Sequence, residues 1–360
     1  MKRFKAALIG CSRMGAFIDN EGPKERRQGA YSHAAGYEAS NHTELVACSD
    51  LRTEVLEQTG LRYNIPKQKQ YLDYKEMIDR EQPEIISIAT QPEHRSEIVI
   101  YAAEHGAKAI YAEKAMAASM ADADAMVEAV EKNNVFFNMG TNRRWDPGYD
   151  TMKAVVDSGR IGKLIALVIH STGHLFNTAS HSFDLLQRLN SDCPVSWVQA
   201  HLPNGDEVID GEKLIEDPIG QGILQFENGV TAYALNTGRG MEVEAHGDNG
   251  CVMSRNNEKE WLLREPSNAD YGEQNVLVDG EFPSFKPDSS TRLLIEDLIH
   301  SIESGQAPRG GVRLARANTE LIFAFIKSHL QGGTRINLPL RRSRHRLMRK
   351  REPRQPKYQR

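Results

Sequence analysis

The side chain best placed to do chemistry in the first half of the chain is Lys114, in the stretch Ala-Glu-Lys-Ala-Met. It follows a short apolar run, Ala109–Ala112, and precedes a long amphipathic segment, so it stands at the carboxyl end of a predicted parallel strand. Open α/β sheets bind their ligands in the crevice at these strand ends. Lys114, with Glu113 beside it, is therefore expected to meet a ligand, although such a lysine taken alone is more often a solvated residue.

A second set of polar side chains lies on a helix that we predict over Thr178–Leu189. Asn177, His181 and Asp184 follow one another at i, i+4 and i+7, which brings them to one face of a helix. The apolar residues of the segment fall on another face and are expected in the core: Phe183, Leu186 and Leu189. Histidine can take or release a proton near neutral pH, but a single histidine is more often an ordinary, partly buried residue.

A glycine-containing turn near the start of the chain has the pattern of a dinucleotide-binding loop. The apolar run Phe4–Ile9 leads directly into the turn, in which serine stands at the middle glycine of the GxGxxG fingerprint. The first glycine permits the tight turn, the last lets helix and strand pack closely, and a pyrophosphate would lie on N–H groups at the start of the helix. The residues expected to contact the cofactor are Gly10, Ser12, Arg13, Met14 and Gly15.

An acidic residue follows the next predicted strand, Glu44–Cys48. Asp50 can accept a hydrogen bond from a free ribose 2′-hydroxyl, which favours NAD, whereas Arg52 could meet a 2′-phosphate, so NADP stays open. The distance in sequence from the glycines is longer than usual, and the excess falls in Asp19–Ser32, a polar segment that we predict to be an inserted loop. The helix is expected to resume at His33.

Strand-like and helical patterns alternate through the first part of the chain, which predicts a doubly wound parallel sheet. Ile85–Ala89 is predicted to be a buried strand, and Ser119 with Asp122 forms a capping box for a helix. The second half is richer in strand-like runs and ends in two predicted helices, Ser290–Ser304 and Arg313–Leu330.

Composition excludes several classes of function. The net charge is -4, which gives no general attraction to nucleic acid, and no apolar stretch is long enough to span a membrane. The four cysteines form no CxxC pair, which suits the reducing cytoplasm better than a disulfide framework. No cluster of His, Cys and acidic residues has the spacing of a zinc site, so we predict no metal.

Basic residues gather at the end of the chain, over residues 341–360. A basic tail can bind nucleic acid or anionic lipid. We favour a solvated, disordered end without a specific partner, because no aromatic-rich or helical pattern accompanies the charge.

The order of these motifs resembles that of the glucose–fructose oxidoreductase, inositol dehydrogenase and rhizopine-catabolism (Gfo/Idh/MocA) family of NAD(P)-dependent sugar and polyol dehydrogenases. The resemblance covers about residues 4–340. It rests, with Asp50, on the following segments: Gly10–Gly15, His33-Ala34-Ala35, Ile88–His94, Ala112-Glu113-Lys114, Asn142–Pro147 and Ser158–Gly162.

The resemblance implies an α/β fold in three successive parts. Residues 1–140 would form a Rossmann domain, and residues 141–340 a substrate-binding and oligomerisation domain with a large, mostly antiparallel open sheet. Residues 341–360 would be the basic tail. Because family members generally bury the open sheet face against other copies, a homodimer or homotetramer is expected.

The resemblance also implies the chemistry of a dehydrogenase acting on a sugar or polyol. Oxidation of a secondary alcohol needs a hydride acceptor, a base for the hydroxyl proton, and a donor or cation for the charge that develops on oxygen. His181 would be the base, or the acid in reverse, and Lys114 would orient substrate and nicotinamide and polarise the oxygen. Asp184 would orient His181 or bind a substrate hydroxyl.

Further side chains are implied around the nicotinamide and the substrate. Those that would line the crevice are Thr90, His94, Glu113 and Arg143, with Arg144 and Asn177 as supporting or substrate-binding residues. His170 and His174 flank the predicted helix, and the sequence leaves open whether they line the pocket or are ordinary strand and loop residues.

Two positions depart from the family pattern. Ala115 stands where the family has proline, and Asn177 where it has an acid, which points to a less common branch with a non-standard substrate or slower chemistry. Two other functions therefore remain open. One is an NAD-retaining enzyme that cleaves a glycosidic bond by transient oxidation and elimination, and the other is a cofactor-binding sensor or scaffold without catalysis.

Overall fold

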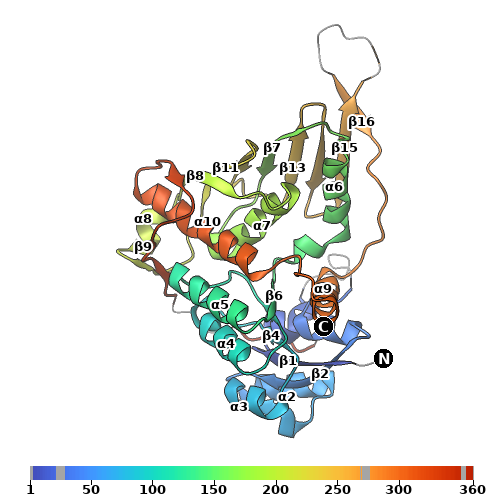
Figure 1. The fold of residues 1–360 in the computed structure, drawn as a ribbon, viewed down its shortest axis with the longest axis vertical. Coiled ribbons are helices and arrows are strands. Elements are labelled where there is room, and N and C mark those ends of the chain that lie inside the picture. The colour runs from blue at the N-terminus through green and yellow to red at the C-terminus, as the bar shows by residue number, and fades with distance from the viewer. Residues whose placement is uncertain (1–2, 22–28, 268, 270–275, 350–353, 360) are drawn as a thin grey trace. The chain divides into compact units, whose positions relative to one another are not determined.

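A computed structural model of the chain describes residues 3–21, 29–267, 269, 276–349 and 354–359 (Figure 1). The chain divides into two compact units. Unit 1 comprises Met1–Trp145, Asp288–Ala317 and Met348–Arg360, and unit 2 comprises Asp146–Pro287 and Asn318–Leu347. These bounds differ from the three successive parts expected from the sequence, because the chain returns to unit 1 twice after leaving it.

The described part of unit 1 is built on a six-stranded sheet in the order β3-β2-β1-β4-β5-β6, with every pair parallel. Both faces are covered, so the strands are nearly continuous apolar runs. The predicted doubly wound sheet is confirmed. Its strands are β1 Phe4–Ile9, β2 Thr43–Ser49, β3 Gln70–Tyr71, β4 Ile85–Ile88, β5 Ala109–Ala112 and β6 Phe136–Met139.

Helices pack on both faces of this sheet. The longer ones are α1 His33–Ala39, α2 Thr53–Tyr63, α3 Tyr74–Glu81, α4 Pro92–Glu104, α5 Met120–Lys132 and α9 Ser290–Ser304. The short turns are η1 Arg13–Phe17, η2 Ile18–Asn20, η4 Lys67–Lys69 and η5 Asn142–Trp145. The predicted cap of α5 is present, since Ser119 Oγ accepts from the Asp122 N–H at 3.1 Å.

Helix α9 explains why unit 1 includes residues from late in the chain. Its buried side chains Leu294 and Leu298 belong to one hydrophobic cluster with Ala6 and Ile85 of the parallel sheet. A Cβ on Gly36 of α1 would lie 2.8 Å from Ile295 of α9. The helix therefore covers the Rossmann sheet, although its sequence lies beyond most of unit 2.

The described part of unit 2 is built on a nine-stranded sheet in the order β16-β15-β14-β13-β7-β12-β11-β8-β17. Only β7 and β12 run parallel there, so the expected mostly antiparallel sheet is confirmed. Its strands are β7 Leu164–Ile169, β8 Val195–His201, β11 Gln221–Phe226, β12 Thr231–Ala234, β13 Val243–Gly247, β14 Gly250–Arg255, β15 Glu260–Pro266, β16 Leu277–Gly280 and β17 Ile336–Asn337.

The remaining elements of unit 2 are short strands and helices. The strands β9 Ile209–Asp210, β10 Lys213–Leu214 and β18 Arg346–Leu347 form a small second sheet. The helical elements are α6 Pro147–Asp157, η6 Leu175–Ala179, α7 Ser180–Leu189, α8 Gly205–Val208 and α10 Val312–Leu330, which begins in unit 1. Within the described part of the chain, no helix has the length and apolarity that crossing a membrane requires.

Candidate active site

The glycine turn after β1 has the geometry that its sequence predicts. Gly10 has a φ of +86°, and a Cβ there would lie 3.0 Å from the Ala89 carbonyl group. A Cβ on Gly15 would lie 2.0 Å from the Gly10 carbonyl oxygen, so any larger residue would displace the backbone. The two glycines therefore let the turn close against β4 and against itself.

The predicted helix start after the turn consists of two short helical turns. A single π-helical turn, η1, passes into the 3-10 turn η2, and Ser12 provides no side-chain cap for η1. The first N–H groups of a helix have no intrahelical partner and can bind a pyrophosphate. The Arg13 guanidinium instead binds Glu21, with its Nε 2.7 Å from Oε1, and this hydrogen bond raises the pKa of Arg13.

Asp50 lies against the glycine turn, at the carboxyl end of β2. Its Oδ2 accepts from the Cys11 N–H at 2.9 Å, and its Oδ1 accepts from the Arg52 N–H at 3.0 Å and from Arg52 Nε at 3.4 Å. Each carboxylate oxygen can accept more than one hydrogen bond. Asp50 therefore fits a ribose hydroxyl, and Arg52 is already paired with it.

Thr90, at the end of β4, adds a further sign that this edge takes a ligand. Its hydroxyl is buried without a hydrogen-bond partner among the described residues. Its Cγ2 lies 3.3 Å from where a Cβ on Gly10 would stand. This edge therefore offers hydrogen-bond donors and acceptors that suit a dinucleotide: the uncapped η1 turn, the Asp50 carboxylate and the Thr90 hydroxyl.

At the end of β5, Glu113 is the centre of a buried hydrogen-bond network. Its Oε1 lies 3.1 Å from His33 Nε2, and His33 Nδ1 lies 3.0 Å from the Ser87 hydroxyl. Tyr37 completes the chain at 2.8 Å from Ser87, and the His33 ring stacks on Tyr111 at 3.7 Å. His33 was noted only as a family landmark, and its contact with Glu113 was not predicted.

Lys114 is partly buried beside this network, and the Lys114–Ala115 peptide bond is cis. Its backbone N–H donates to Glu113 Oε2 at 3.3 Å. Burial by itself raises the pKa of Glu113, but the hydrogen bond from His33 and the charges of His33, Lys114 and Arg95 outweigh burial and hold that pKa below its ordinary value. Glu113 is thus a buried carboxylate that stays charged at neutral pH.

Arg95 is a residue of this region that the sequence reasoning missed. It is 1% exposed on α4, and its guanidinium donates to the carbonyl oxygens of Ala115 and Thr90. Burial lowers its pKa to about 10, against the opposing charges of Glu113 and Glu93. Arg95 thereby ties together the turns after β4 and β5, which carry Thr90 and Lys114.

Three other predicted residues of unit 1 have different surroundings. His94 is exposed on α4, and Arg143 is partly exposed in η5. Arg144 is 1% exposed, and its Nη1 lies 3.2 Å from the Arg309 carbonyl oxygen, while Arg309 Nη2 donates to the Arg144 carbonyl at 2.6 Å. These contacts join η5 to the segment after α9.

In unit 2, the predicted helix begins as a π-helical turn, η6, before α7. Asn177 is exposed in η6, whereas His181 lies in the first turn of α7 and Asp184 is buried there. The predicted common face therefore crosses from one helix type to another. Asp217 accepts from the N–H groups of Phe176 at 2.9 Å and of Asn177 at 3.0 Å, which fixes the start of the turn. The apolar residues of α7 are buried in the core as predicted: Phe183, Leu186 and Leu189.

The two flanking histidines have local contacts in unit 2. His170 Nε2 lies 3.1 Å from Glu244 on β13, and its Nδ1 lies 2.9 Å from Arg239. His174 is exposed, and its Nδ1 lies 2.8 Å from the Asp217 carbonyl oxygen.

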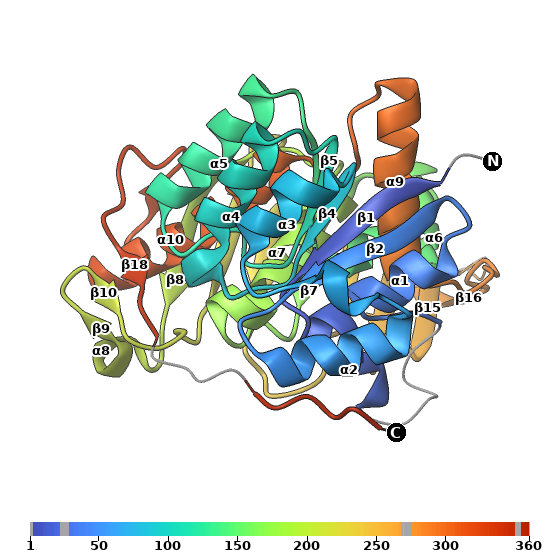
Figure 2. The ribbon, with the colours of Figure 1, turned by 90° about the horizontal axis from the view of Figure 1, so that it is seen from below.

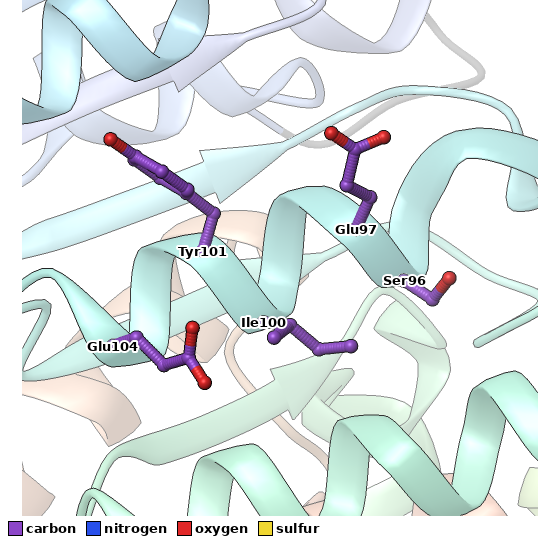
Figure 3. Close-up of a pocket in the computed structure, with 5 residues that line it drawn as sticks. All are labelled: Ser96, Glu97, Ile100, Tyr101 and Glu104. Atoms are coloured by element: carbon purple, nitrogen blue, oxygen red, sulfur yellow. The ribbon is translucent and has the colours of Figure 1, made fainter.

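A surface hollow of about 390 Å³ on α4 contains none of the predicted site residues. Figure 3 shows the side chains that line it: Ser96, Glu97, Ile100, Tyr101 and Glu104. The Glu97 carboxylate accepts from Tyr74 of α3 at 3.0 Å, and Tyr101 donates to Asp79 of the same helix at 2.8 Å. These polar groups join two helices.

Comparison with known proteins agrees with this geometry. Residues 4–141 match the model of an oxidoreductase family with an NAD-binding Rossmann fold. The myo-inositol 2-dehydrogenase of Thermotoga maritima is 24% identical over 303 residues, which cover 77% of this chain and 86% of that protein. The D-apiose dehydrogenase of Paraburkholderia graminis is 35% identical over 163 residues, which cover 45% of this chain and 38% of that protein.

A solved structure extends the likeness to both units. The crystal structure of an aldose-aldose oxidoreductase from Caulobacter crescentus, complexed with glycerol, has a TM-score of 0.75 at 19% identity and covers 94% of this chain and 100% of that one. That likeness shows the fold. With the motifs built on the Rossmann sheet, the family match shows that residues 4–141 form the NAD-binding Rossmann part of a Gfo/Idh/MocA oxidoreductase.

Proposed function

We propose that this protein is an NAD-dependent dehydrogenase that moves a hydride between the nicotinamide and a secondary alcohol carbon of a sugar, polyol or related cyclic substrate. The observation that carries the proposal is the position of Lys114 at the end of β5, beside the buried Glu113 and His33 pair. The relatives named as inositol and apiose dehydrogenases support the substrate class. The exposed 2′-hydroxyl of NAD suits the Asp50 carboxylate better than a 2′-phosphate does.

We assign the two chemical tasks of the protein to Lys114 and His181. When bound, NAD supplies the hydride acceptor. His181 takes the proton of the substrate hydroxyl and returns it in the reverse direction. The Lys114 ammonium stabilises the negative charge that develops on the oxygen. Asp184 holds the His181 ring or a substrate hydroxyl, and Asn177, which replaces an acid, leaves His181 a weaker base.

The test is the rate of NADH formation over a panel of inositols, aldoses and other polyols. We expect turnover of at least one member, and Lys114→Ala should lower kcat about 100-fold or more because the developing charge loses its cation. Lys108→Ala is the matched control, since Lys108 is exposed and pairs with Glu84 at 2.9 Å.

Two results would count against the proposal. One is no turnover of any panel member, and the other is an unimpaired Lys114→Ala variant. NAD that copurifies with the protein, without net NADH formation, would instead indicate the NAD-retaining cleavage of a glycosidic bond.

The assembly and location of the protein are part of the proposal. We propose a homodimer or homotetramer joined through the face of the nine-stranded sheet that carries the exposed side chain of Tyr233 and the partly exposed side chain of its partner Val168. We place the protein in the cytoplasm, where the free thiols of its four cysteines stay reduced.

A further inference from the structure

The C-terminal segment, 354–359, lies on the edge of the Rossmann sheet where the cofactor binds. We define it by its described residues only. Before it, Arg349 pairs with Glu93 at the start of α4, with Nε 2.8 Å from Oε1, and both side chains are largely buried at 6% and 14% exposure. Arg349 Nη2 also lies 3.3 Å from Gln91, next to the turn after β4. Arg349, the last described residue before the segment, is therefore held near the carboxyl end of that strand.

The segment itself contacts the elements that follow β1 and β2. Gln355 Nε2 donates to Glu54 in the first turn of α2 at 3.3 Å, and Asn20 of η2 donates to the Lys357 carbonyl at 2.6 Å. Figure 2 shows this last part of the chain running beside α2. Its contacts with α2 and η2, which follow β2 and β1, place it at the edge at which parallel sheets bind dinucleotides.

Tyr358 is the side chain that turns inward from the segment. Its ring meets Phe17 edge to face at 5.0 Å and packs against the hydrophobic cluster that contains Cys11 and Cys48, from the glycine turn and the end of β2. Burial raises the pKa of the Tyr358 phenol, and the charges of Glu54, Arg52 and Asp50 also act on it. An aromatic ring thus lies near the carboxylate that suits the ribose.

We propose that the C-terminal segment forms the outer wall of the adenosine half of the NAD site, with the Tyr358 ring placed to stack on the adenine. An aromatic side chain binds a nucleobase through its flat face, which all four bases offer. Asp50 takes the ribose next to it. The segment is thus a part of the cofactor site contributed by a stretch of chain more than 300 residues after the glycine turn.

The test is calorimetric titration of NAD into the full chain and its variants. Tyr358→Leu keeps an apolar group on the cluster but removes the ring, and it should weaken NAD binding about tenfold. Tyr358→Phe keeps the ring and should bind like the parent. A chain that ends at Arg349 keeps the ion pair between Arg349 and Glu93. It should lose at least as much affinity for NAD as Tyr358→Leu. Gln359→Ala, at an exposed position, is the control and should change nothing.

Trypsin gives a second measurement on the unaltered protein. Saturating NAD should slow cleavage after Lys357, which is exposed in the segment. Unchanged affinity in both Tyr358→Leu and the shortened chain would overturn the proposal. So would tighter binding by the shortened chain, because the segment would then compete with the cofactor. Neither measurement uses an alcohol substrate, so failure here is distinct from failure of the proposed dehydrogenase activity.

Discussion

At the scale of single residues, the carboxylate of Glu113 is the charge on which the Lys114 turn depends. It is buried, and it receives a hydrogen bond from His33 and one from the backbone of Lys114. Replacing it with Gln keeps the shape but removes the charge that balances Arg95 and Lys114. We expect Glu113→Gln to lower the free energy of unfolding at pH 7 by about 1–3 kcal/mol, because buried partners lose a charge-assisted hydrogen bond.

The lowered pKa of Glu113 determines how the stability difference between the parent and Glu113→Gln depends on pH. The pKa is below 4.5 in the folded protein, so the stabilisation is complete above the unfolded value and is lost as pH falls through the folded value. Parent and Glu113→Gln should therefore differ most near pH 7 and converge as pH falls through the lowered pKa of Glu113. Denaturant unfolding of both proteins across this range measures the difference. A deficit that stays constant with pH would show that Glu113 contributes through shape alone.

At the scale of elements, Arg95 joins two turns that are distant in sequence. Its guanidinium binds the carbonyl oxygens of Thr90 and Ala115, and it is the planar fork of arginine that can reach both. Arg95→Lys keeps the positive charge but replaces the guanidinium by a single ammonium group. Arg95→Met removes both the charge and the hydrogen-bond donors. We expect the free energy of unfolding to be highest for the parent, lower for Arg95→Lys and lowest for Arg95→Met. Each backbone carbonyl left without a hydrogen bond should cost about 1–3 kcal/mol.

A catalytic readout separates positioning from stability. If Arg95 positions the Lys114 turn, Arg95→Lys should lower kcat more than it raises KM at a temperature at which the variant is fully folded. Arg80→Lys is the matched control, because Arg80 pairs with Glu76 in an exposed i, i+4 contact on α3. Equal kcat values for the parent and Arg95→Lys would leave Arg95 with a structural role only.

Local sequence patterns predict some of these turns and helices but not the contacts between them. The glycine turn, Asp50 and the Lys114 turn could be predicted because local patterns define them. Arg95 could not, since its acceptors are backbone carbonyls that no pattern of side chains records. The helix Ser290–Ser304 was predicted with its bounds, but helical periodicity does not tell which sheet the apolar stripe covers.

At the scale of the whole molecule, the contacts of the basic tail could not be predicted from its composition. A run of cations with few apolar residues is typical of a solvated end. The tail nevertheless meets acids that lie far away in the sequence, Glu93 for Arg349 and Glu54 for Gln355. Composition alone could not supply those partners, and Tyr358, a single aromatic residue, gave no detectable pattern.

Assembly is the remaining property of the whole molecule, and the sheet of unit 2 argues for it. Tyr233 of β12 is 41% exposed, and Val168, its partner on β7, is partly exposed on the same face, whereas Leu167 and Ala232, which point the other way, are buried. A sheet face with large apolar side chains in contact with water gains free energy when a second copy covers it. We expect sedimentation velocity to give the mass of a dimer or tetramer at micromolar concentration. Val168→Lys combined with Tyr233→Lys should shift the protein toward the mass of one chain. Leu61→Lys places the same charge on α2, where Leu61 is 76% exposed, and should leave the mass unchanged. A single-chain mass for the parent, or a full assembly in the double variant, would show that this face does not join the copies.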